Sequence, residues 1–186
     1  MKIKHDFVTN SSSTGFIFLF KGDKRTDLFR QMVKYEDKFK LFNEYGGGED
    51  YINVWDIIRE LDPILSSTRE DPWYLPGPLK MNDLLERYEG ELKANEEALK
   101  DELKQESEGV KWTGSDWTKE YIKELEEKII KVKKAIHNKL DHYVEVSFGD
   151  NDGMISGGRI GMTMDYSGRS INLNQKDFVV MIENQH

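Results

Sequence analysis

The chain contains 186 residues, of which 37% are hydrophobic and 33% charged, and it carries a formal net charge of −8 and no cysteine. This length predicts one domain over residues 1–186, and the acidic balance disfavours direct binding to nucleic acid or to an anionic membrane. The absence of cysteine excludes disulfides, thiolate metal ligands and thiol nucleophiles. No apolar signal segment follows Met1, and the longest apolar run, residues 16–20, is too short to span a bilayer, so we expect a cytoplasmic protein.

The first predicted strand follows a polar segment. Residues 10–15 are rich in Ser, Thr and Asn, whose side chains bond to their own backbone and favour a turn. Residues 16–20 form a short, continuous and largely aromatic run, which predicts a buried strand. Hydroxyls and free amides can also cradle phosphate, but no Gly-Lys-Ser/Thr pattern follows, so we favour the turn over a phosphate-binding loop.

The same N-terminal stretch carries a distinctive string. Residues 7–18 read FVTNSSSTGFIF and follow Lys2 and Ile3. This string resembles an N-terminal signature of many small uncharacterised phage and bacterial proteins, in which Met-Lys-Ile-Arg precedes Phe-Val-Ser-Asn, a run of Ser, and then Phe and a strand. The chain departs from the signature at Lys4 and Thr9, and Thr and Gly interrupt its Ser run. The resemblance covers roughly the first tenth of the chain and implies a phage or prophage origin, hence the cytoplasm of a host cell, without implying any chemistry.

The first predicted helix covers residues 26–43. Thr26 or Asp27 would cap it, and its apolar face contains Leu28, Phe29, Met32, Val33, Phe39 and Phe42. Three consecutive glycines at residues 46–48 then predict a flexible linker.

A second short helix is predicted over residues 51–61. Pro63 would close it. Its apolar face would contain Ile52, Trp55, Ile58 and Leu61. The following loop, residues 66–79, holds three prolines around Trp73, and we expect it to be pinned over the core.

Residues 81–140 predict an insertion of two long amphipathic helices joined by a turn at residues 110–115. In the second helix, apolar residues recur at alternating spacings of three and four, which places on one face Ile122, Leu125, Ile129, Val132 and Ile136. The first helix repeats this spacing with Leu85, Tyr88, Leu92, Asn95 and Leu99. So short a turn predicts antiparallel packing, with the facing pairs Leu99–Leu125, Leu92–Val132 and Tyr88–Ile136.

The ends of both helices carry their own signals. Asp83 followed by Glu86 resembles a capping box. Gly109 suits the left-handed residue that ends a helix, and a residue at 115–116 can cap the next one. Gly90 is a weak point at which the first helix can kink or restart.

The charges of the hairpin predict the same arrangement. The lysines of residues 128–139 would lie beside the acids of residues 86–91, whereas the tip, residues 96–108 and 116–127, stays acidic. An acidic face is most often simply solvated. The sharper hypothesis is a docking surface for a basic partner, with the candidate contact residues Glu96, Glu97, Asp101, Glu102 and Glu106.

The remaining residues predict a small antiparallel sheet. Residues 143–148 alternate between polar and apolar side chains, as a half-buried strand does. An acidic cluster at residues 149–153 fits a hairpin turn and is too short for a calcium loop, so we expect no bound metal. Further strands would form a meander, which residues 16–20 can join, over residues 160–164, 171–173 and 178–182.

No catalytic motif accompanies this α+β arrangement of a small sheet, short helices and a projecting hairpin. The HExxH and Gly-x-Ser-x-Gly patterns do not occur, and His137 and His142 have a spacing that does not stack them on one helical face. We therefore expect no cofactor, and we expect a phage-type accessory protein that binds and modulates a host or phage protein, such as a defence protein, rather than an enzyme.

Two other interpretations stay open. The first is a small-molecule or nucleotide-binding protein, or a small enzyme, with a pocket between sheet and helices lined by Trp55, Trp73, Arg159 and Arg169. The second is a structural component of a virion, for which assembly of the chain with itself would be the sign.

Overall fold

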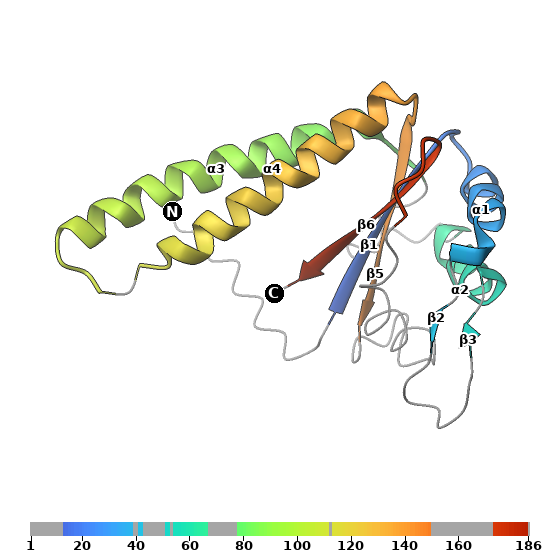
Figure 1. Cartoon of the computed structure of the whole chain (residues 1–186), viewed down its shortest axis with the longest axis horizontal. Coiled ribbons are helices and arrows are strands. Elements are labelled where there is room, and N and C mark those ends of the chain that lie inside the picture. Colours follow the sequence, from blue (N-terminus) through green and yellow to red (C-terminus); the bar gives the residue numbers. More distant parts are fainter. Residues whose placement is uncertain are drawn as a thin grey trace.

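The structure is a computed structural model, which describes residues 13–38, 41–42, 51–52, 54–66, 78–111, 113–149 and 173–185 (Figure 1). Its helices are α1 (Arg25–Lys34), a 3-10 turn (Glu36–Lys38), α2 (Val54–Ser66), α3 (Met81–Ser107) and α4 (Ser115–His137). Its strands are β1 (Ser13–Phe20), β2 (Leu41–Phe42), β3 (Tyr51–Ile52), β4 (Leu79–Lys80), β5 (His142–Gly149) and β6 (Phe178–Gln185). The predicted α+β class is confirmed.

Strand β1 lies inside a four-stranded antiparallel sheet of order β4-β5-β1-β6. Its residue Phe18 is paired with Val144 of β5 on one side and with Val180 of β6 on the other. The prediction that residues 16–20 join the C-terminal strands is therefore confirmed. Strands β2 and β3 form a separate two-stranded pair.

Helices cover both faces of this sheet, so the arrangement has three layers (Figure 1). Alternate residues of a strand point to opposite faces. On one face, Phe16, Phe18 and Phe20 pack with residues of α1 and α2, namely Leu28, Met32, Val54, Ile57 and Leu61. On the other face, Ile17 and Leu19 pack with the base of the hairpin, namely Met81, Leu84, Tyr88, Leu125, Ile129 and Val132. Residues 16–20 of β1 are each 0% exposed.

Two expectations about the strands are corrected. Residues 13–15 do not form a turn, because they pair with residues 147–149 and 183–185, and the ladder overrides the local preference of their side chains. Strand β5 is not half-buried at its start, because Tyr143 packs toward the hairpin and Val144 toward α1 and α2, so both are buried.

The first helix is shorter than predicted. It ends at Lys34 rather than continuing to residue 43. Tertiary contacts explain the stop, because the Tyr35 ring stacks on Phe178 and its hydroxyl donates to the Asp177 carboxylate. Asp27 is not the N-cap; it lies in the first turn and accepts a hydrogen bond of 3.3 Å from the backbone N–H of Lys24, which is the N-cap.

The second helix is longer than predicted and presents a different face. It runs through Pro63 to Ser66, although an interior proline removes one backbone hydrogen bond and its ring crowds the carbonyl of the preceding turn. Among the α2 residues whose burial is described, Val54, Ile57 and Leu61 are buried, whereas Trp55 points outward and is 59% exposed. Residue 52 belongs to β3 and not to this helix.

The hairpin is confirmed, with different helix starts. Helix α3 begins at Met81, because the backbone N–H of Met81 donates to the carbonyl of Asp141 and anchors the helix to the sheet. Asp83 therefore lies inside the first turn and does not cap, and α3 continues without interruption through Gly90. Gly114, with φ of 88°, is the N-cap of α4, so Ser115 is the first helical residue.

Several predicted features lie outside the described residues. These are residues 1–12, which include the first half of the N-terminal signature, the glycine linker at 46–48, the loop at 67–77 and the strand at 160–164. Within the described part of the chain, no helix is both long and apolar enough to cross a membrane.

Candidate interaction surface on the helical hairpin

The hairpin leaves the core about one-third of the way along α3. The buried residues of α3 are Met81, Leu84 and Tyr88, all near its start, and the helix continues to Ser107 without another. Beyond Tyr88 the two helices pack on each other, away from the sheet (Figure 1). Among the residues predicted to face each other across the hairpin, Leu125 is buried, and Leu92 and Leu99 are half-buried.

Polar contacts between the two helices support their antiparallel packing. Lys133 forms an ion pair of 2.8 Å with Glu89, as the charge pattern predicts. The Tyr121 hydroxyl donates to the Glu91 carboxylate over 3.1 Å. At the base, the Arg87 guanidinium lies 2.7 Å from the Glu145 carboxylate and connects α3 to β5.

The end of α3 is closed by a Schellman motif, which confirms the predicted role of Gly109. The backbone N–H of Gly109 donates to the carbonyl of Glu106, and that of Val110 donates to the carbonyl of Gln105. Gly109 has φ of 93°, a conformation that glycine adopts without strain. The helix therefore ends at a fixed point, and the tip has a defined shape.

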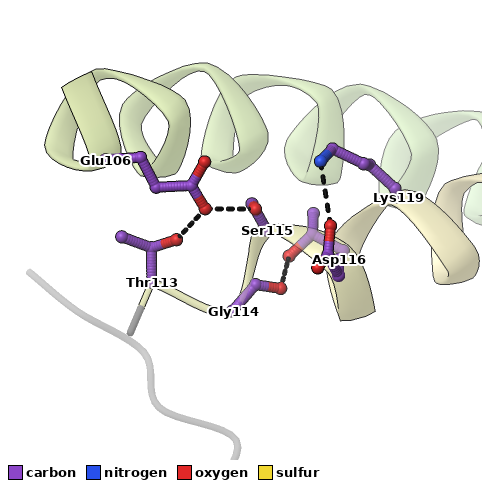
Figure 2. Close-up of polar contacts among 7 residues, drawn as sticks. Glu106, Thr113, Gly114, Ser115, Asp116 and Lys119 are labelled. Carbon is purple, nitrogen blue, oxygen red and sulfur yellow. Dashed lines mark hydrogen bonds and ion pairs between the residues drawn. The ribbon is translucent and has the colours of Figure 1, made fainter. Parts of the chain in front are cut away.

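The Glu106 carboxylate connects the two helices at this tip (Figure 2). The hydroxyls of Thr113 and Ser115 both donate to the same carboxylate oxygen. These two donors, that of Ser115 most of all, stabilise the ionised form and hold the pKa of Glu106 below its ordinary value. Lys119 forms an ion pair of 3.0 Å with Asp116 one turn further along α4.

Large apolar side chains are exposed around this tip. Trp117 is 74% exposed, and three further residues are exposed beside it in the sequence or across the turn, namely Leu103, Val110 and Tyr121. Three of the acids predicted as contacts, Glu96, Glu97 and Asp101, are exposed in the distal half of α3. The tip thus combines apolar side chains with negative charge.

The structure separates the five predicted contact acids into different roles. Glu96, Glu97 and Asp101 are exposed, and Glu102 is half-buried. Glu106 contacts Thr113 and Ser115 and therefore holds the turn. Sequence reasoning missed Trp117 and Tyr121. Their signal was available, because aromatic residues at a spacing of four that do not belong to the apolar seam of α4 are expected at its surface.

The alternative pocket residues are not brought together in the described part of the chain. Trp55 is exposed on α2, and Trp73, Arg159 and Arg169 lie outside the described residues. Among the residues that the structure describes, no group of three or more His, Asp or Glu side chains is arranged to hold a metal ion.

Comparison with known proteins identifies no relative. A scan against protein-family models, a search of curated proteins and a search of solved structures each found no match.

Proposed function

We propose that the chain is a phage-type accessory protein that acts by protein–protein interaction, and that it docks the tip of the α3–α4 hairpin on a basic surface of its partner. The observation that carries this proposal is the 74% exposure of Trp117 at an acidic tip that stands away from the core. Tryptophan is among the residues that most often dominate interface energies.

The energetics favour binding over a purely structural role for the tip. An exposed indole ring adds little to the stability of the free chain, whereas its burial in a partner's pocket removes a large apolar surface from water. The exposed acids Glu96, Glu97 and Asp101 would accelerate association with a positively charged partner and select against an acidic one. The Schellman motif and the Glu106 contacts keep the tip ordered before binding, which lowers the entropic cost.

The resemblance of residues 7–18 to phage and prophage proteins supports the choice of partner. Proteins of that kind meet a bacterial host, so the proposed partner is a host or phage protein, and the proposed effect is inhibition or modulation, for example of a defence protein. The proposal needs no cofactor and no reaction.

A capture experiment with matched tryptophan variants tests this proposal. The tagged chain is used to isolate a partner from bacterial lysate, and the purified partner is then titrated with the Trp117→Ala and Trp55→Ala variants. Trp55 is the control, since it is also exposed but lies on α2. Trp117→Ala is expected to weaken binding by about 2 kcal/mol or more, as at an interface hot spot, and Trp55→Ala to leave it unchanged.

Charge reversal provides the second arm of this experiment. The triple variant Glu96→Lys, Glu97→Lys, Asp101→Lys is expected to slow association and to reduce its dependence on salt. The control reverses Glu36 and Asp37, which are exposed on the 3-10 turn. Binding that survives both Trp117→Ala and the triple reversal would rule out the tip as the contact surface.

A further inference from the structure

An open pocket of about 600 Å³ lies at the base of the hairpin, where the end of β1, the start of α3, the end of α4 and the start of β5 meet. Its apolar floor is formed mainly by Ile136, since Met81 and Leu140, which also line the pocket, are each 2% exposed. Three lysines from three separate segments, Lys21, Lys80 and Lys139, line the same pocket. This volume is within the range of small-molecule sites.

The charge of the pocket is opposite to that of the whole chain, which has a net charge of −8. The three lysines are exposed, and none of them forms an ion pair within the part of the chain that the structure describes. One acid, Asp141, lines the pocket with them. Three lysines against one carboxylate leave a surplus of two positive charges before His142 is counted.

Asp141 is already engaged by its own neighbours. Its carboxylate accepts a hydrogen bond of 2.9 Å from the backbone N–H of Gly22 and lies 3.3 Å from Nδ1 of His142. Burial raises the pKa of Asp141, but the contacts with Gly22 and His142 outweigh that effect and hold it below the ordinary value. Both contacts use Oδ1, and no ion pair joins Asp141 to a lysine in the described part of the chain, so the lysines remain available to an anion.

Lys139 occupies a backbone position at which glycine is usual. It has φ of 69°, and it follows α4 in a second Schellman motif, in which the backbone N–H of Leu140 donates to the carbonyl of Ala135. A lysine in this left-handed conformation is strained relative to glycine. Residues held in such conformations cluster at functional sites.

We propose that this pocket binds a small organic phosphate, with its phosphate group among Lys21, Lys80 and Lys139 and its apolar part over Ile136. A phosphate ester carries between one and two negative charges at neutral pH, which matches the surplus of the pocket. His142, whose side chain is 18% exposed, also lines this pocket. This site is at the opposite end of the hairpin from the proposed docking tip, so the two proposals can fail separately.

Phenyl phosphate is the probe that tests the pocket, because it joins a phosphate to an apolar ring. The full chain is titrated at low salt, and backbone amide shifts are followed by NMR. We expect saturable shifts at Lys80, Lys139 and His142, and tighter binding of phenyl phosphate than of inorganic phosphate or glucose 6-phosphate, because only phenyl phosphate covers the apolar floor. Equal binding of all three would overturn the apolar part of the proposal.

The variant Lys139→Gly separates binding from structure. Glycine removes one cation and also relieves the left-handed strain, so the melting temperature should be unchanged or higher while affinity falls about tenfold. The control is Lys93→Gln, an exposed lysine of α3 that does not line the pocket. An unchanged affinity in Lys139→Gly, or an equal loss in Lys93→Gln, would show general attraction of the anion to surface lysines and would overturn the proposal.

Discussion

The central strand of the sheet and the tip of the hairpin have opposite relations to solvent. In β1, residues 16–20 are each 0% exposed, because helical layers cover both faces of the strand. At the tip, Trp117 is 74% exposed and α3 has had no buried residue since Tyr88. The buried sheet therefore supplies the stability of this chain, and the tip of the hairpin presents exposed apolar surface.

The largest contrast is expected from aromatic truncation in the two regions. Phe18→Ala removes a fully buried ring of β1 that stacks on the Phe178 ring, so the free energy of unfolding should fall by about 3–5 kcal/mol. Trp117→Ala removes a larger ring at the surface and should change it by no more than about 0.5 kcal/mol. Urea unfolding followed by circular dichroism measures both. A large loss in Trp117→Ala would mean that the tip contributes to the core and would end the contrast.

Two glycine substitutions, one beside the core and one in the hairpin, should change the stability of the chain in opposite directions. Gly22 has φ of 116°, and an added Cβ would lie 2.6 Å from Oδ2 of Asp27, so Gly22→Ala should destabilise the chain by about 1–3 kcal/mol. Gly90 lies inside α3 with open space around it, so Gly90→Ala should stabilise by about 0.5–1 kcal/mol. Thermal unfolding of the two variants gives the comparison, and equal effects would contradict it.

The smallest expected effect is local to the tip and depends on pH. The pKa of Glu106 is lowered, so its contribution is present above the pKa of the unfolded chain and is lost as pH falls through the folded value. An NMR titration of its side-chain carboxyl should therefore find it titrating below other exposed glutamates. Ser115→Ala removes the main donor and should return the pKa toward its ordinary value; no change in that variant would show that the Ser115 contact is not made.

Features of the fold that depend on residues close together in the sequence could be predicted, and features that depend on distant residues could not. The apolar seam of Leu125, Ile129 and Val132 is a short-range periodicity, and the hairpin it predicts is present. The predicted cap of α3 at Asp83 and the predicted end of α1 at residue 43 were wrong, because the first turn of α3 and the end of α1 are each set by a residue more than fifty positions away, Asp141 and Asp177 respectively. No window along the sequence contains both partners.

The candidate surface shows the same division. An acidic tip could be predicted from composition along the two helices. The inward role of Glu106 could not, because it depends on where the turn places Thr113 and Ser115. The pocket could not be predicted either, since Lys21, Lys80 and Lys139 line one pocket only when β1, α3 and α4 meet at the base of the hairpin.

The position of β1 has a consequence for how the chain is made. During translation, residues 16–20 leave the ribosome long before β5 and β6, whose residues begin at 142 and 178. The nascent chain therefore carries an aromatic strand whose neighbours do not yet exist, whereas the hairpin can form earlier from contacts between segments close in sequence. A message truncated before residue 178 would leave one edge of β1 without its partner, and such edges invite association with other chains. Cellular quality control, rather than folded-state stability, would then decide the yield of the protein.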